Sequence, residues 1–179
     1  VQAAAAKIKT GPVLMIGGFM GVGSPHRLLD SIVELAPKNL IIIANDTARP
    51  GHGIGKLISA GLVDRVITSH IGLNPETQAK MISGEIQVEL VPQGTLVERI
   101  RAAGYGLGGC LVKTGLGTLA EQGKEIIHIN EEPWLLEKPL HADFALIHAH
   151  QADYLGNLSY QLTATNFNPV MAMSAKHVI

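Results

Sequence analysis

Apolar runs recur along residues 1–103, with no polar alternation at 40–44, and are separated by segments of helical periodicity. The runs predict strands at 12–16, 40–44, 65–69 and 85–91. Helices are predicted between them at 25–35, 54–62, 75–82 and 94–103, the first with Ser24 as N-cap and Pro25 in its first turn. Strands that are apolar on both faces and separated by helices predict an α/β fold, an open doubly wound, mostly parallel sheet with helices on both faces.

The pattern changes after residue 103. Residues 104–118 hold six glycines and predict a long mobile or ligand-shaped loop. A hairpin is expected at 124–129 and 134–137, strands at 144–149 and 158–162, and a helix at 168–176. No linker divides the chain, so residues 1–179 are expected to form a single domain. The start at Val1 and the apolar last residues predict a domain incomplete at both ends, with a strand cut off at 177–179.

Composition narrows the function classes. Hydrophobic residues make up 46% and the net charge is −1, with Lys and Arg scattered, so a nucleic-acid surface is not expected. Cys110 is the only cysteine, which predicts a reducing, cytoplasmic location without disulfides. The longest apolar runs are too short to span a bilayer, so no membrane partner is expected.

The segment after the first predicted strand is rich in glycine. Its residues are Gly17, Gly18, Phe19, Met20, Gly21, Val22 and Gly23. Backbone N–H groups there, together with the start of the next helix, favour a bound anion such as a phosphate. The alternative is a tight turn that binds nothing. A dinucleotide fingerprint is the rival motif, and Asp46 stands where a ribose-binding acid would, but the glycine spacing does not match.

Polar side chains follow the next three predicted strands. Asn45, Asp46 and Thr47 follow the second, Ser69, His70 and Asn74 the third, and Gln93 and Thr95 the fourth. Ligands of open α/β sheets bind beyond the carboxyl ends of the strands. These groups are therefore candidates to hold a small carboxylate or a thioester carbonyl through neutral hydrogen bonds. Taken singly, each is as well explained as a cap of a turn or helix.

Residues 14–25 resemble the α-side signature of family I CoA-transferases: three apolar residues, Gly-Gly-Phe, three residues, Gly, one residue, Pro. Further blocks follow in the family's order. They are Ile-Ala-Asn-Asp-Thr at 43–47, Ser-His-Ile-Gly-Leu-Asn-Pro-Glu at 69–76, Ser-Gly-Glu at 83–85, Val-Pro-Gln-Gly-Thr-Leu at 91–96 and Asn-Phe-Asn-Pro at 166–169. The similarity is greatest to α subunits of acetate or acetoacetate CoA-transferases.

The resemblance implies a ping-pong transfer of CoA between a short-chain acyl-CoA and a free carboxylic acid, through a covalent glutamyl intermediate. It implies that a β subunit supplies this glutamate, in an α2β2 assembly, and that this chain holds no catalytic residue, metal or permanent cofactor. The loop from Gly17 to Gly23 is then expected to contact CoA, and Asn45 and Gln93 to line the acyl or carboxylate pocket. Glu85 is interpreted as structural, and Glu76 as a first-turn helix acid.

Other residues carry weaker hypotheses. His148 and His150, two apart on an expected strand and near Asp153, are a conceivable metal site without further ligands. Cys110 is interpreted as a buried filler, and Tyr105, Leu107 and Leu111 as residues that close over a ligand or pack against a partner. Two other functions stay open: an NAD-dependent oxidoreductase and a non-enzymatic module that binds acyl-CoA.

Overall fold

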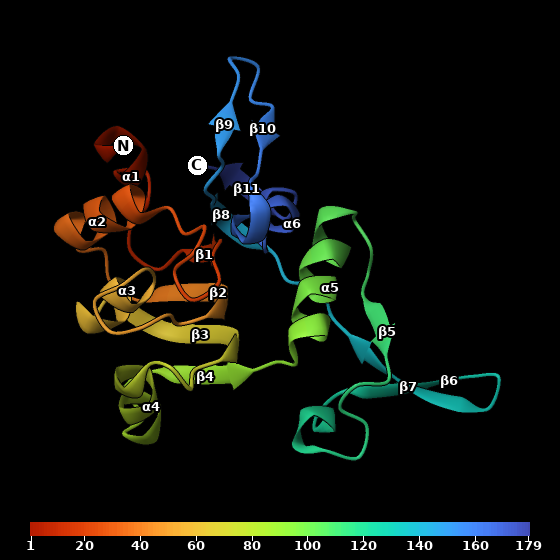
Figure 1. Cartoon of the computed structure of the whole chain (residues 1–179). Helices are drawn as coiled ribbons and strands as arrows, with labels where there is room; N and C mark the ends of the chain where they lie inside the picture. Colours follow the sequence, from red (N-terminus) through yellow and green to blue (C-terminus); the bar gives the residue numbers. More distant parts are fainter.

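The computed structural model describes residues 1–179 and is built around a six-stranded sheet (Figure 1). The strand order is β11-β8-β1-β2-β3-β4, and every neighbouring pair is parallel. The strands are β1 (Val13–Ile16), β2 (Leu40–Asp46), β3 (Val63–His70), β4 (Gln87–Leu90), β8 (Ala142–Leu146) and β11 (Ala175–Val178). The order reverses between β1 and β8, because the chain first builds the sheet toward β4 and later returns to the other side of β1.

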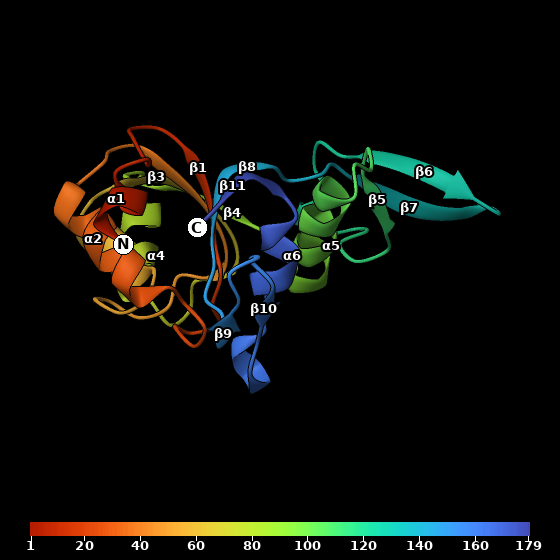
Figure 2. The same cartoon turned by 90° about the horizontal axis from the view of Figure 1, so that it is seen from above.

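Helices cover both faces of this sheet. One core cluster joins α1 (Gln2–Ala5), α2 (His26–Leu35) and α3 (Gly55–Ser59) to one face. The other cluster joins α5 (Gln93–Gly104) and α6 (Asn168–Ala172) to the opposite face. Figure 2 shows the two groups on either side of the strands. The doubly wound parallel sheet is thus confirmed. None of the helices is long and apolar enough to cross a lipid bilayer.

Helix α4 (Pro75–Ile82) shows how the sequence sets an element boundary. The side chain of Asn74 accepts a hydrogen bond from the Thr77 N–H, and Pro75 occupies the first helical position. Glu76 lies in the first turn, as predicted, where the helix dipole favours an acid. By contrast, α2 begins at His26 after Pro25 and has no side-chain cap, so the prediction that Ser24 caps it was wrong.

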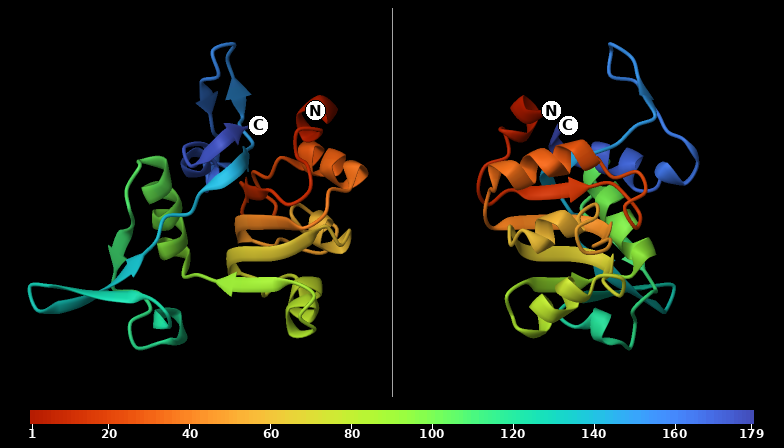
Figure 3. Two further views of the ribbon diagram at one scale, coloured as in Figure 1. Left: turned by 180° about the vertical axis from the view of Figure 1, so that it is seen from behind. Right: turned by 60° about the vertical axis from the view of Figure 1, so that its left-hand side comes forward.

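Two small sheets project from this core (Figure 3). β5 (Cys110–Val112), β7 (Glu132–Glu137) and β6 (Glu125–Ile129) form an antiparallel sheet beyond α5. The hairpin of β6 and β7 was predicted. The interpretation of residues 104–118 as one loop missed β5. β9 (Gln151–Ala152) and β10 (Leu158–Ser159) form a separate hairpin.

The last third departs most from the predictions. The predicted strand at 144–149 ends at Leu146, and the one at 158–162 is reduced to β10. Short 3-10 turns occur at Leu119–Glu121 and Leu162–Ala164. The predicted helix at 168–176 stops at Ala172, because Lys176 already belongs to β11, which confirms a strand at the end of the chain.

Candidate functional site

Polar side chains meet at the carboxyl edge of the parallel sheet. Asn45 and Asp46 are the last two residues of β2, Ser69 is next to last in β3, and Gln93 opens α5 directly after β4. Neighbouring parallel strands end at the same edge, so these residues lie side by side. The predicted gathering of polar groups at this edge is therefore present.

One hydrogen-bonded chain connects these side chains. Gln93 Nε2 donates to Asn45 Oδ1 at 2.6 Å. Ser69 Oγ donates to the backbone O of Asn45 at 2.6 Å and also lies 3.1 Å from Asn45 Oδ1. Asn45 Nδ2 in turn donates to Asp46 Oδ2 at 2.8 Å. Asn45 is only 1% exposed, whereas Gln93 lies at the surface. Gln93 is thus the member of the pair that a ligand in solvent reaches first.

The glycine loop, residues 17–23, is a tight reversal of the chain. Phe19 and Val22 exchange two backbone hydrogen bonds of 2.9 Å around Met20 and Gly21. Met20 has φ 51° and Gly21 has φ 89°, the signs that a type I′ turn requires. The tip exposes the apolar side chains of Phe19, Met20 and Val22.

Most N–H groups of the glycine loop already have acceptors in the protein. Those of Gly17, Gly18 and Met20 donate to Leu146 O, Asn166 Oδ1 and Asp46 Oδ2. Only the N–H groups of Gly21 and Gly23 have no acceptor within the chain. The expected crowd of free amides is therefore reduced to two, so the loop offers an anion a narrow contact rather than a full cradle.

Two asparagines of the Asn-Phe-Asn-Pro segment at 166–169 hold the glycine loop from the side. Asn166 accepts from Gly18 N–H and donates to Val22 O, each at 3.0 Å. Asn168 donates to Gly23 O at 3.0 Å. A Cβ on Gly17 would lie 1.9 Å from Asn168 Oδ1, which explains the glycine there. Residues 18 and 166 are far apart in the sequence, so the periodicity of the sequence could not reveal this contact.

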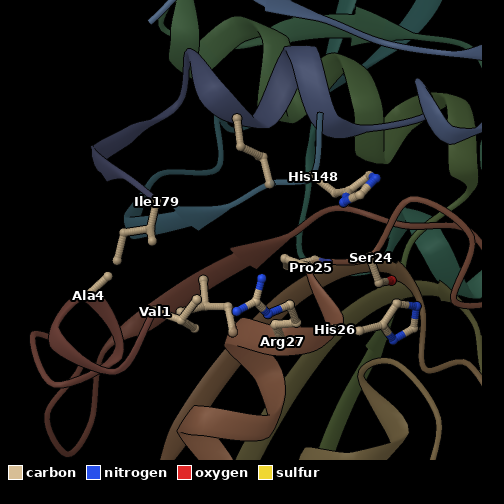
Figure 4. Close-up of a pocket in the computed structure, with 10 residues that line it drawn as sticks. Val1, Ala4, Ser24, Pro25, His26, Arg27, His148 and Ile179 are labelled. Carbon is tan, nitrogen blue, oxygen red and sulfur yellow. The ribbon is translucent and has the colours of Figure 1, made fainter. Parts of the chain in front are cut away.

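A cavity of about 350 Å³ opens beside the start of α2 (Figure 4). It is lined by His26 and His148, by the apolar side chains of Ile147 and Leu28, and by Val1 and Ile179. Burial lowers the pKa of His26, against a smaller opposite effect of its hydrogen bond to Gly21 O. Neither Asn45 nor Gln93 lines this cavity, so the cavity is separate from the hydrogen-bonded side chains at the sheet edge.

The weaker candidates fall outside the site. His148 and His150 follow the end of β8, so the strand predicted to align them was wrong. Asp153 accepts from Leu155 N–H and from both nitrogens of Asn157, which folds the turn between β9 and β10. No group of three or more His, Cys, Asp or Glu side chains is arranged to hold a metal ion.

Cys110 and Glu85 have structural surroundings. Cys110 is half-buried rather than buried, so it was wrong to expect a fully buried filler. Partial burial, reinforced by Glu137, raises the pKa of its thiol, which disfavours the nucleophilic thiolate. Glu85 forms an ion pair with Lys80 before β4 begins, at the opposite edge of the sheet from Asn45. Tyr105 and Leu107 are exposed beyond α5, and Leu111 is half-buried in β5.

Comparison with known proteins identifies the family of this chain. Residues 1–179 match the Coenzyme A transferase family. The chain belongs to that family. It is 54% identical over 175 residues to the acetate CoA-transferase subunit alpha of Escherichia coli K12, covering 98% of this chain and 80% of that protein. It is 57% identical over 171 residues to the acetoacetyl-CoA:acetate/butyrate CoA transferase alpha subunit of Clostridium acetobutylicum, covering 96% and 78%.

Solved CoA-transferases share the fold. An acyl-CoA transferase from Escherichia coli O157:H7, in a thioester complex with CoA, superposes with a TM-score of 0.84 at 22% identity, over 99% of this chain and 41% of that chain. Glutaconate CoA-transferase from Acidaminococcus fermentans gives 0.82 at 19%, over 99% and 66%. The resemblance to CoA-transferase α subunits is confirmed, and the comparisons support neither the oxidoreductase nor the stand-alone binding module.

Proposed function

We propose that this chain is the α subunit of an enzyme that moves CoA between a short-chain acyl-CoA and acetate or acetoacetate. A β subunit, in an α2β2 assembly, supplies the attacking glutamate. The names of the two relatives support the α role and the substrate class. The absence of disulfides, with Cys110 as the only cysteine, supports a reducing, cytoplasmic setting.

The observation that carries the proposal is the chemistry of the sheet edge. It offers amides and a hydroxyl from Asn45, Gln93 and Ser69, joined by hydrogen bonds. The only carboxylate there, Asp46, already accepts from three donors and is buried. An edge of this kind suits the binding of a carboxylate or thioester, and it leaves the nucleophile to the partner.

The proposed reaction divides one exchange into two halves. The partner's carboxylate attacks the acyl-CoA carbonyl, the C–S bond breaks, and an acyl–glutamyl anhydride and CoA thiolate result. The thiolate then attacks the glutamyl carbonyl, which releases the first acid and leaves a glutamyl-CoA thioester. The second acid reverses these steps. Gln93 Nε2 keeps one proton free to donate to the oxyanion. The N–H groups of Gly21 and Gly23 have no acceptor within the chain and are left to contact CoA.

Copurification with the β subunit and an exchange assay test this proposal. The isolated chain is expected to be inactive with acetoacetyl-CoA and acetate, and the reconstituted complex to be active. Borohydride added with acyl-CoA alone is expected to reduce the thioester on the β chain and stop turnover. CoA transfer by the isolated chain, or borohydride reduction of a residue on the α chain, would contradict the proposal that the β subunit supplies the glutamate.

A further inference from the structure

The Asp46 carboxylate stands between the two parts of the candidate site. Its Oδ2 accepts from Met20 N–H of the glycine loop and from Asn45 Nδ2, each at 2.8 Å. Its Oδ1 accepts from Ala48 N–H at 2.7 Å. The residue is 4% exposed. A buried carboxylate with three donors is strongly held in place, because losing one partner leaves a desolvated charge.

Asp46 also fixes which way the Asn45 amide points. Since Asn45 Nδ2 donates to Asp46, its Oδ1 must face the other way, toward Ser69 Oγ and Gln93 Nε2. Gln93 is then held through its nitrogen, and its Oε1 and one N–H are left for a ligand. The buried carboxylate of Asp46 therefore sets the orientation of the exposed Gln93 amide, and it does so through Asn45.

We propose that Asp46 is the positioning residue that couples the glycine loop to the Asn45–Gln93 pair, so that one side chain sets the geometry of both the CoA side and the acid side. This inference rests on the proposed function. It assigns Asp46 neither to ribose recognition nor to simple turn capping. The residue touches no substrate, and it acts only through Met20 N–H and Asn45.

If Asp46 couples the two parts of the site, its substitution changes the binding of both substrates and also the hydrogen exchange of the glycine loop. Asp46→Asn keeps the size, but its amide nitrogen cannot accept, so a donor among Met20, Asn45 and Ala48 loses its partner. The KM values for both acyl-CoA and acetate are expected to rise about tenfold or more, as follows from a lost hydrogen bond to a charged group. Asn166→Ala, which removes the side-chain bonds to Gly18 and Val22, is expected to raise the acyl-CoA value alone. Gln93→Ala, which removes a donor to both the acyl group and the acid, is expected to raise both values without faster hydrogen exchange at the Met20 amide.

A control carboxylate lies at the opposite edge of the sheet, where it is half-buried rather than buried. Asp143 accepts from Val13 N–H and from Lys176 at the amino ends of β1 and β8. Asp143→Asn is expected to leave both KM values of the complex unchanged. Hydrogen exchange gives a second readout: the amide of Met20 is expected to exchange faster in the Asp46→Asn complex and at the normal rate in the control.

The outcomes separate this inference from the proposed function. An inactive wild-type complex overturns the proposed function, while exchange at Met20 still tests the bond to Asp46. With an active wild type, a rise in only one KM, or a lower melting temperature with both values unchanged, overturns the coupling. If Asp46→Asn does not fold, Asn45→Ala cuts the same series of hydrogen bonds on one side. Both KM values are then expected to rise while the Met20 amide exchanges at the normal rate, and unchanged KM values would overturn the proposal.

Discussion

The parallel strands β1 to β4 and the projecting sheets β5–β7–β6 and β9–β10 differ in how far their side chains are buried. The strands β1 to β3 are largely buried and pack between helices, and their polar exits meet in one hydrogen-bonded chain. The projecting sheets expose large apolar side chains, and in the turn between β9 and β10 Tyr154 is 94% and Leu155 72% exposed. The first region is stabilised by its own core, whereas the sheet β5–β7–β6 is joined to α5 by the ion pair of Glu137 with Arg99. Both projecting sheets leave apolar surface free.

Substitution in the sheet core is expected to have the largest effect on stability. Ile43 in β2 is almost fully buried against α5, so Ile43→Ala should lower the free energy of unfolding by about 3 kcal/mol. Ile129→Ala, at an exposed position of β6, should change it by less than about 1 kcal/mol. Urea denaturation measures both, and equal effects would erase the contrast between the regions.

The brace on the glycine loop should rank second. In Gly17→Ala the new methyl group overlaps Asn168 Oδ1, so the loop or Asn168 must shift, at an expected cost of about 2 kcal/mol. Gly94→Ala is the control, because nothing lies near its added carbon and it stands in the first turn of α5. Thermal unfolding of the two variants should separate them by several degrees. A stable Gly17→Ala variant would show that the brace is dispensable.

The attachment of the small sheet depends on Glu137 in β7. Its carboxylate is 2% exposed and pairs with Lys124 and Arg99. Glu137→Gln should cost about 1–3 kcal/mol, because both cations lose their charged partner in a desolvated setting. Protease cleavage within residues 105–137 should accelerate. Glu132→Gln, which breaks the exposed pair with Lys113, should change neither quantity measurably.

The smallest effect concerns acid. Burial alone would raise the pKa of Glu89, but hydrogen bonds from Arg99 and Arg65 outweigh burial and hold this pKa below its ordinary value of 4.5. The ionised form therefore stabilises the fold above about pH 4.5, and this contribution is lost as the pH falls through the lowered pKa. Glu89→Gln should be less stable than wild type at pH 7 by up to about 1 kcal/mol, since the pair is partly exposed. Denaturation at pH 3 should show the difference narrowed, and a widened one would reverse the assigned sign.

Sequence patterns predicted what burial and strand polarity determine. The apolar runs located β1 to β4, and the parallel arrangement placed Asn45, Ser69 and Gln93 at one edge. Sequence patterns could not reveal that Asp46 accepts from Met20, or that Asn166 and Asn168 hold the glycine loop. Those hydrogen bonds depend on how segments far apart in the sequence pack together. The half-exposed strand β5 and the short β10 carry too little apolar signal beside glycines to be recognised.

The brace from Asn166 has a consequence for the order in which the protein matures during synthesis. Strands β1 to β4 and their helices use only residues up to 104, so a nascent chain can assemble this part of the sheet early. The partners of Gly18 and Val22 emerge from the ribosome more than 140 positions later. The reversal at Met20 and Gly21 can then be held on the Asp46 side before Asn166 is synthesised, and its full set of hydrogen bonds can form only after residue 166 has joined the fold.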